Sequence, residues 1–101
     1  MLEKGKRQRT ASLDVYLAPS HAARSRLGLI VPKHGHRIVD RNLLKRRLRE
    51  IGRRRVLPML DARERGMDVL IRARVPAYAT EYDGLAREVM EAVEVLCSRV
   101  S

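Results

Sequence analysis

The chain has 101 residues, of which 45% are hydrophobic and 34% are charged. This length supports one modest hydrophobic core, and this balance is atypical of disordered chains and of membrane proteins, so we expect a single domain over residues 1–101. No apolar run approaches the roughly 18 residues of a membrane span. The one cysteine, Cys97, excludes an internal disulfide framework. We therefore expect a cytoplasmic protein that contacts no membrane.

Positive charge is concentrated in the first part of the chain, and the formal net charge is +10. Residues 1–60 contain 16 basic and 4 acidic residues, whereas residues 61–101 contain 6 basic and 8 acidic residues. Lys and Arg gathered on part of a small domain are typical of a protein that binds a polyanion. The alternative is a basic protein whose charged surface is merely solvated.

The first predicted element follows a basic lead-in over residues 1–10. The run SLDVYLA predicts a strand over Ser12–Ala18, in which apolar and polar residues alternate. This alternation indicates one buried face, formed by Leu13, Val15 and Leu17.

The next two predicted elements are a strand and a helix. The strand, Leu27–Val31, is apolar on both faces, so we expect it at the centre of a sheet. The helix extends from about Ile38 to Val56 and should end near Pro58, because the residue before a proline avoids helical geometry.

The second half of the chain predicts one more strand and one more helix. The strand, Met67–Arg74, places Arg72 and Arg74 on the face opposite its buried residues. The helix should begin at Thr80 as the N-cap, with Asp83 three residues later. Its buried side is formed by Leu85, Val89, Ala92, Val93, Leu96 and Val100, and its outer side by Glu88, Glu91 and Glu94. The expected fold is α+β, with helices on one face of a small sheet.

The central predicted helix combines an apolar side with a cationic side. Helical spacing of 100° per residue groups Leu44, Leu48 and Ile51 toward the core. Like charges four residues apart repel one another, and a phosphate backbone relieves that repulsion. A solvated face is the alternative, but this one lacks the alternating acidic residues of a salt-bridged face. We therefore predict contact with RNA or DNA by Arg41, Asn42, Lys45, Arg46, Arg49 and Arg53.

Three motifs together resemble one family. RNLLKRRLRE at residues 41–50 resembles the arginine-rich signature of the protein subunit of bacterial ribonuclease P. RLGLIVPK at 26–33 and DVLIRARVPA at 68–77 are similar to the strands on either side of that signature. The resemblance implies a two-layer α/β sandwich like the second domain of a small-subunit ribosomal protein. It also implies a left-handed βαβ crossover, whereas the general rule predicts a right-handed one.

The resemblance also implies a function. Members of the family assist a catalytic RNA that removes the 5′ leader of precursor tRNA, and magnesium is expected mainly on that RNA. The signature helix, with Lys33 and His34 in the loop before it, would contact the catalytic RNA. Tyr16, Arg72 and Arg74 would line a cleft for the single-stranded leader, although the Tyr16 ring has the alternative of packing on a neighbouring side chain. The polypeptide alone is expected to be inactive, with no catalytic residues.

The sequence departs from the family pattern at three places. Leu43 replaces an arginine of the signature and lies away from the cationic side of the predicted helix. The glycine of the loop before the helix is displaced to Gly35. The N-terminal helix of the family has no counterpart, since Met1 falls where that helix would be ending.

Alternative functions are conceivable for some of the same residues. His34 and His36 flank Gly35, and two imidazoles at this spacing could share a metal, but no cysteine or carboxylate pair completes the site, so loop histidines near phosphate are preferred. A general RNA-binding or ribosome-associated module of the same fold is the main alternative function. Binding of DNA in a major groove is not expected, because the signature helix lacks the partner helix of a helix-turn-helix.

Overall fold

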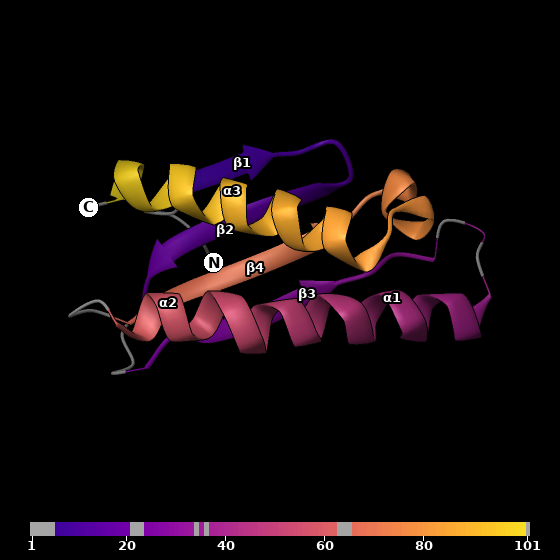
Figure 1. Cartoon of the computed structure of the whole chain (residues 1–101), viewed down its shortest axis with the longest axis horizontal. Coiled ribbons are helices and arrows are strands. Elements are labelled where there is room, and N and C mark those ends of the chain that lie inside the picture. Colours follow the sequence, from indigo (N-terminus) through magenta and orange to yellow (C-terminus); the bar gives the residue numbers. More distant parts are fainter. Residues whose placement is uncertain (1–5, 21–23, 34, 36, 63–65, 101) are drawn as a thin grey trace.

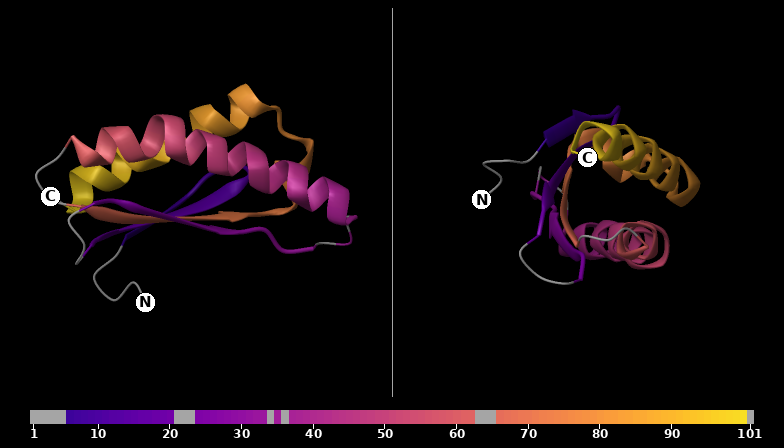
Figure 2. Two further views of the ribbon diagram at one scale, coloured as in Figure 1. Left: turned by 90° about the horizontal axis from the view of Figure 1, so that it is seen from below. Right: turned by 90° about the vertical axis from the view of Figure 1, so that its left-hand side faces the viewer.

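The computed structural model describes residues 6–20, 24–33, 35, 37–62 and 66–100. They form a four-stranded sheet with helices on one face only (Figures 1 and 2). No helix in these ranges is long and apolar enough to cross a membrane. In chain order the elements are β1 (Lys6–Arg9), β2 (Leu13–Pro19), β3 (Arg26–Ile30), α1 (Ile38–Ile51), the π turn η1 (Gly52–Val56), α2 (Leu57–Asp61), β4 (Met67–Ala73), the 3₁₀ turn η2 (Val75–Ala79) and α3 (Tyr82–Val100).

The sheet has the strand order β1-β2-β4-β3. The pairs β1–β2 and β2–β4 are antiparallel, and β3–β4 is parallel. The chain passes from β3 to β4 through α1, η1 and α2, which lie on the face toward the viewer in Figure 1. If that view is turned until β3 and β4 point upward, β4 lies to the left of β3. The crossover is therefore left-handed, as the family resemblance implied.

The core lies between the sheet and the helices. Leu13, Val15 and Leu17 of β2 are fully buried, which confirms the predicted alternation. Val69 and Ile71 of β4 face the same core. From the helices the buried residues include Leu44, Leu48, Ile51, Leu85, Val89, Val93 and Leu96. The predicted α+β class, with helices on one sheet face, is thus confirmed.

Two expectations about the strands are wrong. The basic lead-in contains the strand β1, which pairs with β2 through the main chain although it has no apolar alternation. The strand β3, expected at the centre, is an edge strand that pairs only with β4. Its Leu27 and Leu29 pack against the core, whereas Ile30 remains 43% exposed. Hydrophobicity in β3 thus reflects the layer of helices over one face and not a central position in the sheet.

The long helix does not end before Pro58. It continues through the π turn and α2 to Asp61, and Pro58 lies in the first turn of α2, where its missing N–H is tolerated. The π turn has a packing reason. Ile51 and Leu60 are nine residues apart, which in an uninterrupted α-helix means a rotation of about 180°. Both are 0% exposed. The wider π turn changes the phase of the helix and brings Leu60 onto the core side.

The expected N-cap at Thr80 is also wrong. The 3₁₀ turn η2 ends before Thr80, and α3 begins only at Tyr82. The Thr80 hydroxyl donates to the carbonyl oxygen of Pro76 at 2.8 Å and lies 2.9 Å from the Ser12 hydroxyl. Thr80 therefore joins η2 to the start of β2 and does not cap α3.

Candidate nucleic-acid interface

A groove lies between the basic side of the long helix and the edge strand β3. It has a volume of about 300 Å³. Its outer wall carries the exposed side chains of Lys45, Arg49 and Arg53, which were predicted to bind phosphate. Its floor is apolar and consists of Leu27, Leu29 and Leu57. Three of the six predicted helix residues are therefore gathered along one groove, where their charges face solvent.

The other three predicted helix residues lie outside that groove lining. Asn42 and Arg46 are exposed on α1. Arg41 is half-buried, and its Nε and Nη2 both donate to the carbonyl oxygen of Val31 at 3.3 Å. The guanidinium of Arg41 thus ties the start of α1 to the residue that follows β3.

The loop between β3 and α1 is anchored at its start. The hydroxyl of Tyr78 donates to the carbonyl oxygen of Pro32 at 2.8 Å, and Lys33 is exposed beyond this point. Gly35 has a φ of 78°, a conformation that favours glycine. The predicted contact His34 and its neighbour His36 lie outside the described residues. In the ranges that are described, no group of three or more His, Cys, Asp or Glu side chains could hold a metal ion.

The sheet face opposite the helices carries Tyr16. The register pairs Tyr16 with Leu70 of β4, and both side chains are half-buried on this face. Arg72, two residues further along β4 on the same face, lies opposite Asp14 and is exposed. The predicted placement of Tyr16 and Arg72 on the face opposite Leu13 is confirmed, because alternate residues of a strand point to opposite faces. We call this surface the open face.

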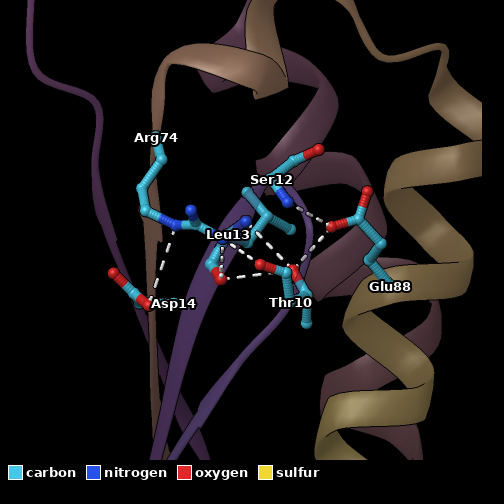
Figure 3. Close-up of polar contacts among 6 residues, drawn as sticks. All are labelled: Thr10, Ser12, Leu13, Asp14, Arg74 and Glu88. Carbon is cyan, nitrogen blue, oxygen red and sulfur yellow. Dashed lines mark hydrogen bonds and ion pairs between the residues drawn. The ribbon is translucent and has the colours of Figure 1, made fainter.

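Arg74 is half-buried and is held by several contacts (Figure 3). Its Nη2 donates to the carbonyl oxygens of Thr10 and Leu13, and its Nε lies 3.8 Å from the Asp14 carboxylate. Only 23% of its side chain is exposed. The structure thus separates Arg74 from Arg72: the first ties the β1–β2 turn to the end of β4, and the second faces solvent.

Comparison with known proteins identifies the family. The family model of ribonuclease P matches residues 1–97. The chain belongs to the ribonuclease P protein family. A relative from Kocuria rhizophila, the ribonuclease P protein component, is 36% identical over 98 residues, which are 97% of this chain and 83% of the relative.

Solved structures of ribonuclease P proteins share the fold. The protein from Thermotoga maritima, in complex with 1-(4-fluorophenyl)-2-thiourea, has a TM-score of 0.74 at 22% identity, covering 88% of this chain and 83% of the other. The protein from Staphylococcus aureus has a TM-score of 0.72 at 21% identity, covering 92% and 82%. These likenesses confirm the sandwich fold.

The structure shows where Leu43, which departs from the ribonuclease P signature, lies on α1. Leu43 is 43% exposed and lies on the side of α1 away from the basic groove. There it lines a second hollow of about 240 Å³ together with Asp40, Leu44, Arg47 and Tyr78. The prediction that Leu43 lies away from the cationic side of the helix is confirmed.

Two cations of this ribonuclease P protein are not among the residues predicted from the sequence. Arg7 and Arg9 belong to β1, in the segment that was expected to be a basic lead-in. The available signal is their spacing, since residues two apart share a strand face. That signal has meaning only once the segment is known to be a strand.

Proposed function

We propose that this chain is the protein component of a ribonuclease P particle, in which it assists an RNA that removes the 5′ leader from precursor tRNA. The observation that carries the proposal is the signature helix of this family member, whose Lys45, Arg49 and Arg53 line one solvent-facing groove. Guanidinium groups match phosphate oxygens in a bidentate manner, so such a groove is suited to an RNA backbone. In this proposal the groove contacts the catalytic RNA, together with Asn42, Arg46, Lys33 and His34.

The proposed leader contact uses the other side of the molecule. Tyr16 and Arg72 lie on the open face, and the long helix lies on the opposite face of the sheet (Figure 2). A base can stack on a tyrosine ring, and an exposed arginine can neutralise a phosphate. Two separate faces allow one small protein to contact the catalytic RNA and the leader at the same time.

The proposed division of chemistry assigns phosphodiester cleavage to the RNA. Hydrolysis of this kind is assisted by metal ions that activate water and stabilise the leaving oxygen, and magnesium would be held mainly by the RNA. The protein would contribute positive charge that offsets the crowding of phosphates, which its net charge of +10 supports. Its proposed place of action is the cytoplasm.

Reconstitution tests this function directly. The purified chain is mixed with a bacterial ribonuclease P RNA and precursor tRNA at a magnesium concentration too low for the RNA alone. We expect cleavage at the mature 5′ end, and weaker stimulation by the variant Lys45→Ala/Arg49→Ala/Arg53→Ala. A control variant, Arg87→Ala/Arg99→Ala, removes two exposed cations from α3, outside the groove, and should stimulate like the unchanged protein.

Two outcomes would contradict the proposal. Tight RNA binding without stimulated cleavage would indicate a general RNA-binding module. Specific cleavage by the polypeptide after micrococcal nuclease has destroyed all RNA would place the chemistry in the protein.

A further inference from the structure

The strand β1 adds two cations to the open face. The register pairs Arg7 with Tyr16 and Arg9 with Asp14, and directly paired residues of antiparallel strands share a face. Both arginine side chains are exposed. The row that contains Arg9 continues through Asp14 to Arg72 on β4. The half-buried Tyr16 ring therefore has Arg7 beside it on β1, and Arg9 and Arg72 lie two residues further along β1 and β4 on the same face.

The carboxylates of the open face already have cationic partners. Asp14 lies 3.8 Å from Nε of Arg74, and Asp68 accepts hydrogen bonds from Arg26, with an Nε–Oδ1 distance of 2.8 Å. The hydrogen bond to Asp68, and then its charge, raise the pKa of the Arg26 guanidinium. Within the described part of the chain, no ion pair involves Arg7, Arg9 or Arg72. These three cations thus remain available to an anionic partner.

We infer that Arg7 and Arg9 bind the phosphate backbone of single-stranded RNA that crosses the open face with a base over Tyr16. The inference rests on the proposed function and extends it to residues of β1. Neighbouring strands lie about 4.8 Å apart, so long arginine side chains on β1 reach the space beside a ring on β2. A base on the ring and phosphates on the flanking cations are the combination that proteins use to bind single strands with little sequence preference.

A purely protective role of these charges is the competing interpretation. Charged side chains on an edge strand discourage its pairing with the sheets of other molecules. The edge strand β1 carries charge on both faces, since Lys6 lies on the face opposite Arg7 and Arg9. Protection of the edge needs charge but no RNA, and it predicts no change in RNA affinity when Arg7 and Arg9 are replaced. The two interpretations therefore differ in a measurable quantity.

The first experiment measures binding of a fluorescent octauridylate to the whole chain without any other RNA. The variant Arg7→Gln/Arg9→Gln should bind several-fold more weakly at low salt, and the log–log salt slope should fall by about 0.7 for each phosphate that the variant no longer binds. Arg7→Lys/Arg9→Lys should keep most of the slope, because the charges remain. The matched control, Arg87→Gln/Arg99→Gln on α3, should leave affinity and slope unchanged, and thermal unfolding checks that all variants are folded.

The second experiment measures binding of precursor and mature tRNA to the particle assembled with ribonuclease P RNA. The Gln pair should weaken binding of precursor tRNA and spare mature tRNA, which has no leader. An unchanged octauridylate slope in the folded Gln pair would overturn the inference, and so would equal losses for the two tRNAs. If the unchanged protein fails to stimulate cleavage while the octauridylate slope still depends on Arg7 and Arg9, the proposed function fails and the RNA contact stands.

Discussion

Arg41 and Val31 are joined by two hydrogen bonds of 3.3 Å, from Nε and Nη2 of the arginine to the carbonyl oxygen of the valine. Lys45, one turn further along α1, is exposed in the wall of the basic groove. The cationic side of α1 therefore contains one residue, Arg41, that positions the helix, beside residues such as Lys45 whose charges face solvent.

The first prediction separates these two roles. Arg41→Ala should lower the free energy of unfolding by about 1 kcal/mol, because it removes the hydrogen bonds from a charged group to Val31. Lys45→Ala should change it by less than about 0.5 kcal/mol but reduce the salt slope for the catalytic RNA by about 0.7–0.9. Urea unfolding and salt titrations of both variants provide the measurements. Equal effects of the two substitutions on both quantities would contradict the distinction.

The second prediction concerns the Tyr16 ring. Tyr16→Ala should weaken binding of precursor tRNA to the assembled particle by roughly 1–3 kcal/mol if one base stacks on the ring. Mature tRNA should bind as before, and Tyr16→Phe should retain most of the affinity because it keeps the aromatic face. Equal losses for precursor and mature tRNA would instead show that the ring supports the fold.

The third prediction concerns Glu88, which was expected on the outer side of the last helix. Its Oε1 accepts hydrogen bonds from the Thr10 hydroxyl at 2.5 Å and from the Ser12 backbone N–H at 2.8 Å (Figure 3). Glu88→Ala leaves both donors without this acceptor, so it should lower the free energy of unfolding by about 1–3 kcal/mol. Glu88→Gln keeps an oxygen acceptor and should cost less.

Its matched control is Glu91→Ala, at an exposed position of α3, which should change stability by less than about 0.5 kcal/mol. Thermal and urea unfolding of the three variants provide the comparison. A Glu88→Ala protein as stable as the Glu91→Ala protein would show that the hydrogen bonds from Thr10 and Ser12 to Glu88 contribute nothing to stability.

The fourth prediction concerns the close approach of the π turn to β3. A Cβ atom at Gly52 would lie 2.5 Å from Cδ2 of Leu27 and 2.9 Å from its Cδ1. Gly52→Ala should therefore cost about 1–3 kcal/mol through overpacking. In the double variant Leu27→Ala/Gly52→Ala the clash is relieved, so its loss in urea unfolding should be smaller than the sum of the single losses. Additive losses would mean that Leu27 moves aside freely.

The parts of the fold that depend on local pattern could be predicted from the sequence. Alternation identifies the buried face that contains Leu13, because side chains of a strand repeat every two residues. Helical spacing identifies Leu44 and Leu48 as core residues, because side chains of a helix repeat about every 3.6 residues. The position of β3 at the sheet edge could not be predicted, since strand order depends on contacts between distant segments. The strand β1 could not be predicted either, because its sequence has no apolar alternation and it is a strand only through its pairing with β2.

The candidate site shows the same division. Helical geometry alone is sufficient to predict that Lys45, Arg49 and Arg53 share one side of the helix. The contacts of Arg74 could not be predicted, because Thr10 and Asp14 are more than 50 residues away along the chain. The position of Pro58 inside the helical segment depends on the π turn, which changes the hydrogen-bond pattern just before the proline.

The π turn also has a consequence for how relatives should be aligned with this chain. A π turn is equivalent to one extra residue accommodated in a helix. With one residue fewer, Leu48 and Leu60 would be eleven residues apart, and an uninterrupted α-helix would bring them to within about 20° of each other. Relatives whose long helix is uninterrupted should therefore show a one-residue gap opposite the segment GRRRV at residues 52–56. An insertion or deletion of one residue there exchanges one helix type for the other and leaves both the core and the end of the helix in place.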